Sequence, residues 1–474
     1  MRKIASVFYI VICLFLCALP FVGMTVAPTN TTTENREMTA LPNWAEDGKW
    51  NQKYFQQLGE YFNDHFAFRS HLVMADSVIQ SKVFGVSNME RVIVGEEGWL
   101  YYSSTLPDYL GTERMSEREI FNAANNLSLM KQSVELRGAE FLLTVAPNKN
   151  SLYGENMPYY YGMKVNSNSN IEALTERLQE FRIPYADLFA AFRANNETLY
   201  LKKDSHWNEK GAVLAYNTIL DGLEYEHENY ETIANVRTKT TYGDLNRMLY
   251  PISLEPEWNY CYEVEDTFSY VTDTKTVEDA WIETVSNAGN DSLLMFRDSF
   301  GNTLLPYMAN SFGKAYFSKS VPYQLDEYMG TYNPSYVVVE KVERNLSDFA
   351  KIPPVMTGPV VEMDALERLE ETATTIDLRS AEVDADYWQI TGEIATDRLE
   401  TNTKVYVGVT IGDIVTYYEA FTVTTEEGDN GYLLYLPKKS VTDREVKLEI
   451  FVQNESMQKV ASVTIEDVSL LGIE

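Results

Sequence analysis

The sequence predicts an α/β protein in which a parallel sheet carries helices on both faces and an all-β sandwich follows at the C-terminus. Apolar strand-like runs alternate with helical segments from about residue 90 to residue 350, as in sheets built from strand–helix–strand units. From about residue 374, strand-like runs recur at short spacing without helical segments between them. The 474 residues exceed one ordinary domain, and 45% hydrophobic with 23% charged residues is a globular composition.

The first part of the chain supplies the elements of the predicted sheet. Residues 141–146 (Phe-Leu-Leu-Thr-Val-Ala) are almost wholly apolar, as expected of a strand covered on both faces. Ser116 with Glu119 three residues later, and Asn208, are typical of helix N-termini. We expect strands at 91–95, 141–146, 185–188, 292–296, 314–317 and 336–339, and helices at 116–136, 171–181, 208–223 and 301–311.

The expected domain organisation follows from where these patterns change. Residues 353–354 (Pro-Pro) and 358–359 (Gly-Pro) have linker chemistry. Five strand-like runs follow them, and about 100 residues of this kind predict an antiparallel sandwich. We therefore divide the chain into an anchor (1–28), a tether (29–49), an α/β domain (50–350) with an insertion at about 225–290, a linker (351–373) and an accessory sandwich (374–474).

The N-terminus predicts a membrane anchor. Arg2 and Lys3 precede an apolar run over residues 4–26, which at ~1.5 Å per residue is long enough to span a bilayer. The positive charges before the run predict that the rest of the chain lies outside the cell. Ala27-Pro28 is a poor cleavage site, so an uncleaved signal anchor is favoured over a cleaved signal peptide. We expect a single-pass protein of a bacterial surface.

The net charge, the cysteines and the histidines limit the ligands, disulfides and metal sites that the chain can have. A net charge of -31 argues against nucleic acid and against flat docking on anionic lipid, and it is more compatible with a neutral or cationic polymer. Cys261 is the only cysteine after the apolar run, so the exported part has no internal disulfide. The four histidines lack a metal-ligand spacing such as HExxH, so we expect neither a metal nor another cofactor.

His206 is the candidate general base. It stands in residues 204–208 (Asp-Ser-His-Trp-Asn), directly before a predicted helix. Asp204, two residues earlier, can hold the imidazole in one tautomer and stabilise its protonated form. The alternative is a capped turn with a surface histidine.

Ser299 is the candidate nucleophile. The apolar run 292–296 leads into residues 297–302 (Arg-Asp-Ser-Phe-Gly-Asn), and a helix follows. A serine at a strand-to-helix turn lies at the carboxyl edge of a sheet, where free N–H groups of the helix can receive an oxyanion. The alternative is an ordinary N-cap serine.

Taken together, these motifs resemble the SGNH-hydrolase-like family that includes the alginate O-acetyltransferases AlgJ and AlgX, and more closely the Gram-positive DHHW proteins. Asp204 and His206 precede Ser299, as in the permuted arrangement of the alginate enzymes. Arg297 stands where Gly commonly precedes Asp-Ser, and Ser205 stands where the DHHW name has His. Further matching motifs lie in order at 34–36 with Pro42, 64–69, 95–101, 147–149, 243–245 and 340–344.

The resemblance implies an SGNH-hydrolase-like, flavodoxin-like sheet and a Ser299–His206–Asp204 triad that acetylates an exopolysaccharide or wall polymer. Acetyl would pass through an acetyl-serine and would come across the membrane from a multipass acyltransferase. A carbohydrate acetylesterase of the same fold remains open, because both activities share the acyl-enzyme. So does a non-catalytic polysaccharide-binding or assembly protein.

Five more residues are candidates for the oxyanion hole or for substrate binding. Asn148 and Lys149 follow a predicted strand and should lie at the sheet edge of the triad, although a loop Asn and a solvated Lys are the plain alternative. Arg297 and Asn302 flank the nucleophile. Trp207 could stack on a sugar ring, but a Trp beside a helix start more often packs in the core.

Overall fold

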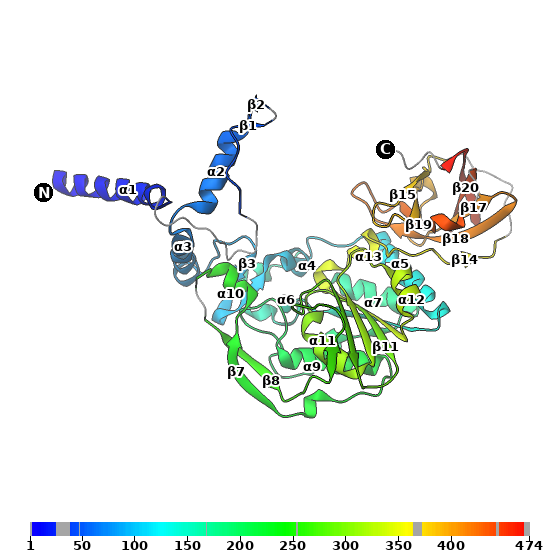
Figure 1. Cartoon of the computed structure of the whole chain (residues 1–474), viewed down its shortest axis with the longest axis horizontal. Coiled ribbons are helices and arrows are strands. Elements are labelled where there is room, and N and C mark those ends of the chain that lie inside the picture. The colour runs from blue at the N-terminus through cyan, green and yellow to red at the C-terminus, as the bar shows by residue number, and fades with distance from the viewer. Residues whose placement is uncertain are drawn as a thin grey trace.

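A seven-stranded mixed sheet forms the centre of the computed structural model, with strand order β6-β5-β13-β11-β12-β10-β9 (Figure 1). The structure describes residues 2–24, 38–46, 48–166, 168–252, 255–363, 372–441 and 445–468. Ala27-Pro28, the motif at 34–36, most of the expected tether and residues 364–371 of the expected linker lie outside this range.

Five adjacent strands of the sheet are parallel, as the sequence predicts, whereas the last two strands at one end are joined by antiparallel pairing. In chain order the parallel strands are arranged 2-1-5-3-4. If β5 and β6 are counted after β13, as in a permuted chain, the order becomes 2-1-3-4-5, a doubly wound order that reverses between β11 and β13. The parallel strands are β5 (Glu140–Ala146), β6 (Tyr185–Ala186), β11 (Ser292–Phe296), β12 (Lys314–Ser318) and β13 (Tyr336–Val342), and the antiparallel ones are β9 (Phe268–Tyr270) and β10 (Trp281–Ser286).

Helices cover both faces of this sheet because successive strand residues point to opposite sides. Leu293 and Met295 pack in one core with α9 (Glu209–Gly222) and α11 (Gly301–Ser311). Leu294 and Phe296 pack in a second core with α5 (Glu117–Leu136), α7 (Asn170–Glu180) and α12 (Leu325–Tyr332). The predicted caps are present: the side chains of Ser116 and Asn208 accept hydrogen bonds from the N–H groups of Glu119 and Gly211.

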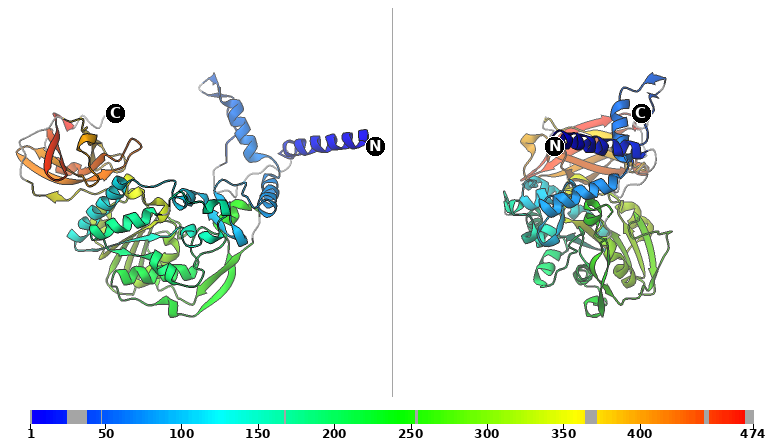
Figure 2. Two further views of the ribbon diagram at one scale, coloured as in Figure 1. Left: turned by 180° about the vertical axis from the view of Figure 1, so that it is seen from behind. Right: turned by 90° about the vertical axis from the view of Figure 1, so that its left-hand side faces the viewer.

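The N-terminal helices extend away from the sheet (Figures 1 and 2). Among the described residues, α1 (Arg2–Met24) is the one helix long and apolar enough to cross a bilayer, over Ser6–Met24 with mean hydropathy 2.6. Two helices follow, α2 (Tyr54–His65) and α3 (Arg69–Val83). The expected strand at 91–95 is β3 (Val92–Val94), which pairs with β4 (Leu100–Tyr102) outside the main sheet.

The segment at 225–290 contains a hairpin and two strands that join the main sheet. Strands β7 (Asn235–Thr241) and β8 (Glu257–Tyr262) pair with each other, and α10 (Asp244–Leu249) lies between them in the chain. The segment then returns through β9 and β10 to the edge of the sheet beside β12. The short helices outside this segment are α4 (Leu106–Leu110), α6 (Lys149–Leu152), α8 (Leu188–Ala194) and α13 (Asp348–Lys351).

The C-terminal part is antiparallel, as predicted, but its strands form one curled sheet, a half-barrel, instead of two separate sheets. The reason is β18 (Ile414–Val423), whose residues 414–420 pair with β17 and whose residues 421–423 pair with β19. One long strand therefore joins both halves. The order is β15-β16-β19-β18-β17-β20-β21, from β15 (Asp377–Ser380), β16 (Tyr387–Glu393), β17 (Lys404–Ile411), β19 (Gly431–Pro437), β20 (Val446–Gln453) and β21 (Met457–Ile465), and β14 (Val360–Val361) also pairs with β18.

Polar side chains of α5 join the half-barrel to the α/β part. The buried Arg118 guanidinium donates to the carbonyls of Thr401 (2.9 Å) and Thr403 (2.7 Å). Asn126 pairs with the backbone of Thr422 in both directions, at 2.9 and 3.1 Å. The half-barrel is thus fixed by directional bonds at α5 (Figure 1).

Candidate active site

Three predicted side chains meet at the carboxyl edge of the sheet. Nε2 of His206 lies 2.9 Å from Oγ of Ser299, and Nδ1 of the same ring lies 2.7 Å from Oδ1 of Asp204. Ser299 follows β11, at the point where the strand order reverses, and His206 stands in the turn before α9. The arrangement can activate a serine: one ring nitrogen can take its proton while the other is held by a carboxylate.

The turn that carries Ser299 is fixed by two acids. Asp298 accepts the N–H of Phe300 (2.8 Å) and that of Val342 (2.7 Å), and its own N–H donates to Glu340 (2.9 Å). Phe300 is the N-cap of α11 and no side chain caps the helix, so Ser299 does not serve as an N-cap. Its hydroxyl is therefore left to His206.

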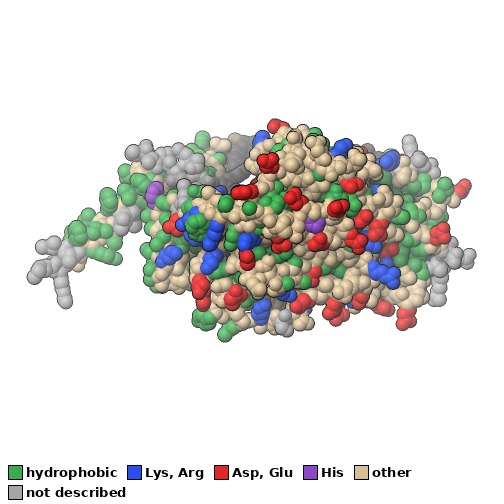
Figure 3. All heavy atoms as spheres, turned by 90° about the horizontal axis from the view of Figure 1, so that it is seen from below, with side chains coloured by type: hydrophobic (Ala, Val, Ile, Leu, Met, Phe, Trp, Pro, Cys, Tyr) green, Lys and Arg blue, Asp and Glu red, His purple; other side chains and the backbone are tan. Residues whose placement is uncertain are grey.

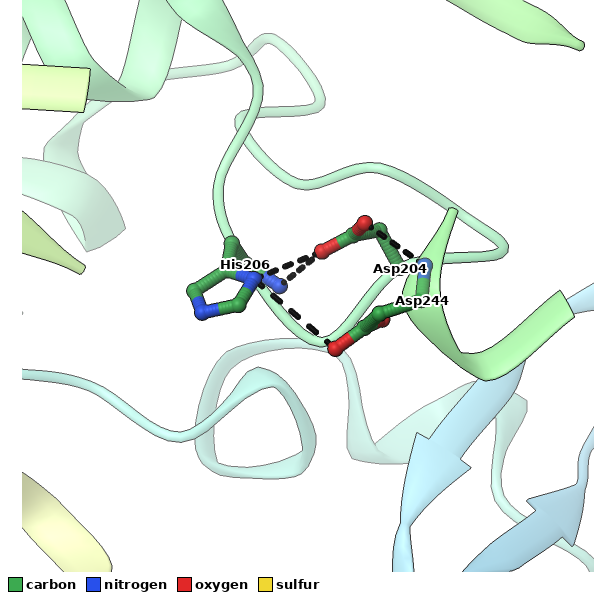
Figure 4. A group of neighbouring side chains, drawn as sticks. All are labelled: Asp204, His206 and Asp244. Atoms are coloured by element: carbon green, nitrogen blue, oxygen red, sulfur yellow. Dashed lines mark hydrogen bonds and ion pairs between the residues drawn. The ribbon is translucent and has the colours of Figure 1, made fainter. Parts of the chain in front are cut away.

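A second acid, Asp244, bonds to Asp204 and lies close to His206 (Figure 4). Its N–H donates to Oδ2 of Asp204 (2.9 Å), and its carboxylate accepts the N–H (2.7 Å) and the hydroxyl of Ser205. Its Oδ2 also lies 3.9 Å from Nδ1 of His206. In Figure 4, Nε2 of His206 points away from both acids, which leaves it directed at Ser299.

These contacts shift the pKa values in the direction that a general base requires. Burial opposes the charged imidazolium of His206, but the hydrogen bond and charge of Asp204, with the charge of Asp244, outweigh burial and raise its pKa above 6.5. Burial likewise opposes ionisation of Asp204, yet the hydrogen bond and charge of His206 lower its pKa to about 2. Burial, followed by the charge of Asp204, raises the pKa of Asp244.

The same three residues are also spaced as metal ligands, with one ligand atom each within 4.8 Å of the others. Those atoms already bond to one another: Oδ1 of Asp204 faces His206 Nδ1, and Oδ2 of Asp204 takes the N–H of Asp244. A metal would have to displace these bonds. The donor set therefore fits the hydrogen-bonded arrangement better than it fits a cation.

Lys149 lies beside the site, as predicted, but in a different role from an oxyanion donor. Its ammonium donates to the carbonyls of Leu201 (3.0 Å), Lys202 (3.1 Å) and Asp204 (2.5 Å). These bonds use all three of its protons. Burial lowers its pKa to about 8. Lys149 thus ties down the loop that carries Asp204 and has no proton left for a substrate.

Asn148 belongs to a neighbouring acidic cluster. Its N–H donates to Glu343 (2.7 Å) and its side chain to Asp108 (3.4 Å). Glu343 also accepts the hydroxyl of Ser151 (2.7 Å). Burial, followed by the charge of Asp108, raises the pKa of Glu343 to about 8. Within the described residues, Asn148 thus bonds to this acidic cluster and to none of Ser299, His206 and Asp204.

Arg297 and Asn302 bond to each other instead of facing outward. The buried Arg297 guanidinium donates to the side-chain oxygen of Asn302 and to the carbonyls of Val277 (2.9 Å) and Asp279 (3.2 Å). Burial lowers the pKa of Arg297 to about 10. Arg297 thus joins the nucleophile turn to the segment before β10, and its expected role at the substrate is not supported.

Trp207 is a core residue. Its side chain is 1% exposed, its indole N–H donates to Thr303 (2.5 Å), and its ring meets Phe300 edge-on at 4.9 Å. A ring this deeply buried cannot stack on a sugar, so the packing interpretation holds and the sugar-binding role predicted for Trp207 is wrong.

The residues best placed to receive an oxyanion or a charged group were not predicted individually. The N–H groups of Ser299 and Gly301 donate to no other group within the described residues. The half-buried guanidinium of Arg344 lies 5.9 Å from the ring centroid of Phe300 and 5.4 Å from that of Tyr102. Arg344 has no hydrogen bond or ion pair in the part of the chain that the structure describes.

Most of the site residues that the predictions missed lie in motifs that the sequence analysis had noted. Asp244 stands in the Gly-Asp-Leu motif at 243–245, and Glu340 and Arg344 bound the motif at 340–344. The order of these motifs carried the family resemblance, but it gave their acids and arginine no roles. Only the fold brings them beside Ser299.

Comparison with protein families identifies this part of the chain. Residues 92–288 match the model of the SGNH hydrolase-like domain, acetyltransferase AlgX. This stretch of the chain is similar to an AlgX-type SGNH hydrolase-like domain. The match includes Asp204, His206 and Asp244 and ends before Ser299. The resemblance expected from the motifs is thus confirmed, and an AlgX-type domain supports acyltransferase or esterase chemistry. Among curated proteins, no sequence matches the chain.

Several solved structures are similar to the chain at low identity. PatB1 of Bacillus cereus shares 17% identity with a TM-score of 0.44, and 54% of this chain covers 98% of that one. A DHHW family protein of Eubacterium siraeum shares 16% identity with a TM-score of 0.41, over 54% of this chain and 95% of that one. AlgX of Pseudomonas aeruginosa shares 12% identity with a TM-score of 0.36, over 79% of this chain and 90% of that one.

Proposed function

We propose that this chain is a membrane-anchored, extracellular serine O-acetyltransferase that acetylates a cell-surface polysaccharide or exopolysaccharide through an acetyl-serine intermediate. One observation carries the proposal: Ser299, His206 and Asp204 form a continuous hydrogen-bonded chain at 2.9 and 2.7 Å where the strand order of the sheet reverses. The match to a domain described as an acetyltransferase supports transfer over other acyl chemistry.

In the first half-reaction, Nε2 of His206 takes the proton of the Ser299 hydroxyl, and Oγ attacks the carbonyl carbon of an acetyl ester. The oxyanion is received by the N–H groups of Ser299 and Gly301, which donate to no other described group. The tetrahedral intermediate collapses as the donor's ester bond breaks. His206 returns the proton to the leaving alcohol, and acetyl stays on Ser299.

In the second half-reaction, an acceptor sugar hydroxyl gives its proton to His206 and attacks the acetyl-serine carbonyl. The Ser299 Oγ–acetyl bond breaks, Oγ recovers the proton from His206, and the acetylated sugar leaves. Asp204 stays ionised throughout, because its pKa is held at about 2 by His206. Water in place of the sugar would give acetate, so an acetylesterase is the second candidate.

The proposed membrane anchor limits the possible sources of the acetyl group. We propose that α1 spans the bilayer and leaves the rest of the chain outside, where cytosolic acetyl donors are absent. A multipass membrane acyltransferase would then supply the acetyl group. No nucleic acid is expected as a partner of a chain with net charge -31.

A groove supports a polysaccharide acceptor; residues on both sides of the Asp204–His206 turn line it, whereas Asp204, His206 and Ser299 do not. It encloses about 670 Å³ between the hairpin β7–β8 and the loop at 201–203. Glu257 of β8 accepts the N–H groups of Lys202 (2.8 Å) and Lys203 (3.1 Å), which joins the groove to the triad loop. Trp258 and Tyr260 line the groove and offer ring faces for sugar stacking.

The charge of this groove is opposite to that of the chain. Five basic and three acidic side chains line it, a formal charge of +2 against -31 for the whole chain. Lys and Arg side chains also gather at the end of the face in Figure 3 where β7 and β8 lie. An acidic glycan fits this groove better than the neutral or cationic polymer that net charge alone favours. The lining charges are Lys202, Lys203, Lys210, Arg237, Lys239, Glu97, Glu197 and Glu257.

The test uses the full chain in detergent, a chromogenic acetyl ester and an acidic oligosaccharide. We expect an acetyl group on the Ser299 peptide and on the oligosaccharide, and a loss of at least ~10³-fold in turnover for Ser299→Ala. Ser311→Ala, at the far end of α11, is the control. Acetate release without transfer would identify an esterase. Equal turnover by wild type and Ser299→Ala would refute an enzyme and favour a polysaccharide-binding or assembly protein.

A further inference from the structure

Helix α3 exposes an apolar stripe to solvent. Phe68, the residue before its first turn, begins the stripe, and Leu72, Ile79 and Val83 continue it at helical spacing. These four side chains are 47–71% exposed. A helix on the surface of a soluble protein turns such a stripe inward.

The opposite face of α3 packs on the protein through two serines, with Val73 and Met74 half-buried beside them. Ser77 and Ser81 are the buried residues of the helix. Ser77 donates to Asn88 (2.9 Å), and the hydroxyls of Ser81 and Tyr250 lie 2.6 Å apart. The apolar side chains of the stripe are thus turned to solvent, with exposed His71 and Asp76 at its flanks, and an apolar medium is expected on this side of α3.

The position of α3 indicates which medium that is. The N–H of Ala67, next to the stripe, donates to the carbonyl of Pro20 in α1 (3.4 Å). A Cβ built on Gly23 of α1 would lie 3.4 Å from the ring of Phe68. The stripe thus starts where α1 ends. In Figures 1 and 2, α3 lies next to the C-terminal end of α1, so a bilayer crossed by α1 would have its outer surface close to α3.

We propose that α3 is an interfacial helix that lies in the outer leaflet surface of the bilayer spanned by α1, with Phe68, Leu72, Ile79 and Val83 among the acyl chains. Arg69 and Lys82 on α3 leave their charges at the headgroups. Because the whole chain is strongly acidic, apolar insertion and not attraction to anionic lipid provides the binding. A spanning helix and an interfacial helix together would fix the orientation of the catalytic part, which one spanning helix cannot do.

The inference rests on the proposed anchor, so the experiment reports on α1 and α3 separately. The full chain is placed in protein-free vesicles of neutral phosphatidylcholine carrying acyl-chain quenchers. Each sample carries one environment-sensitive fluorophore, on native Cys13 in α1, on Ile79→Cys, or on Glu180→Cys, with the other cysteines changed to Ser. Ile79 is exposed, so the label does not disturb packing, and Glu180 is an exposed control on α7.

We expect strong quenching of the labels at Cys13 and residue 79 and none at residue 180. Quenching at Cys13 with residue 79 no more quenched than residue 180 would overturn the interfacial helix and leave the anchor intact. Quenching at neither would overturn both. If the residue 79 label became shielded only when an integral membrane acyltransferase was added, the stripe would be a protein-docking face and the bilayer proposal would be wrong.

Discussion

The ammonium group of Lys149 donates to the backbone carbonyl of Asp204 at 2.5 Å and so connects the end of β5 to the loop of the candidate triad. Two further bonds, to Leu201 and Lys202, complete the contact. Both ends of this connection lie at the carboxyl edge of the sheet. The position of Asp204 and His206 therefore depends on a buried cation that touches neither side chain of the pair.

Replacing Lys149 with Met is expected to reduce turnover and stability together. Three buried carbonyls would lose their donor, which costs about 2–4 kcal/mol in the free energy of unfolding. Urea unfolding and acetyl-ester turnover measure both effects. Lys202→Met, which changes an exposed lysine in the same loop, is the control and should be close to wild type. Unchanged stability in Lys149→Met would show that the carbonyls find other partners.

Replacing Asp244 with Asn tests the electrostatics of His206. The neutral amide can accept the N–H of Ser205 at its oxygen and donate from its NH2 to the Ser205 hydroxyl, but it removes a charge that helps to raise the pKa of His206. The general base must be neutral to accept the serine proton, so activity falls as pH drops through that pKa. We expect the acidic limb of the kcat/KM profile to move to lower pH in Asp244→Asn.

Ser205→Ala is the matched control for this shift, because it removes a hydroxyl next to His206 and keeps the charge of Asp244. Its acidic limb should stay at the wild-type position. If both variants or neither moved the limb, the charge of Asp244 would not be what tunes His206.

Replacing Glu343 with Gln is expected to stabilise the fold at neutral pH. Burial and Asp108 raise the pKa of Glu343 to about 8 in the folded chain, whereas its ordinary value is 4.5. The folded state then holds more protons than the unfolded state between these values, so wild-type stability falls as pH rises from 4.5 to 8. Gln can accept the same bonds from Asn148 and Ser151 without this loss. The gain is roughly 3 kcal/mol at pH 7.

Urea unfolding at several pH values measures this gain. The difference between Glu343→Gln and wild type should be near zero at pH 4, grow up to about pH 8 and then stay level. Exposed Glu180→Gln is the control and should show no such slope. A variant less stable than wild type at pH 7 would mean that Glu343 is ionised in the folded chain.

The sequence predicted the parts of the site that depend on local chemistry. Four apolar residues at 293–296, shortly before Ser299, predict a covered strand, and Asp204 two residues before His206 can lie on the same side of a turn, so both were found. Lys149 was placed at the correct edge but given the wrong role, because the carbonyls that surround it come from residues more than 50 positions away.

The features that were missed depend on long-range pairing. Nothing near β18 shows that one strand serves both halves of the C-terminal sheet, since pairing partners are chosen by tertiary contacts. The role of Asp244 could not be predicted from the sequence either, because it arises only when the segment around α10 packs against the loop that carries Asp204. Trp207 is buried by Phe300, which lies 93 residues later in the chain.

Replacing Trp258 with Ala tests the proposed acceptor groove. Trp258 is half exposed at the groove wall, with the Arg237 guanidinium 5.2 Å from its ring centroid. Loss of a stacking ring is expected to raise the KM for an acidic oligosaccharide by roughly tenfold, about 1–2 kcal/mol, with little change in acetyl-ester hydrolysis. Trp44→Ala, an exposed Trp outside the groove, should leave both unchanged. An unaltered KM would place the acceptor elsewhere.

Replacing Arg118 with Met tests whether the half-barrel is held rigidly to α5. The carbonyls of Thr401 and Thr403 would lose a buried charged donor, at a cost of about 2–3 kcal/mol. That cost falls on the junction, so hydrogen exchange should quicken across β16–β21 while β5, β11 and β13 keep their protection. Arg137→Met, which breaks a more exposed ion pair with Asp326, is the control. Faster exchange in both parts together would instead mean that the two unfold as one cooperative unit.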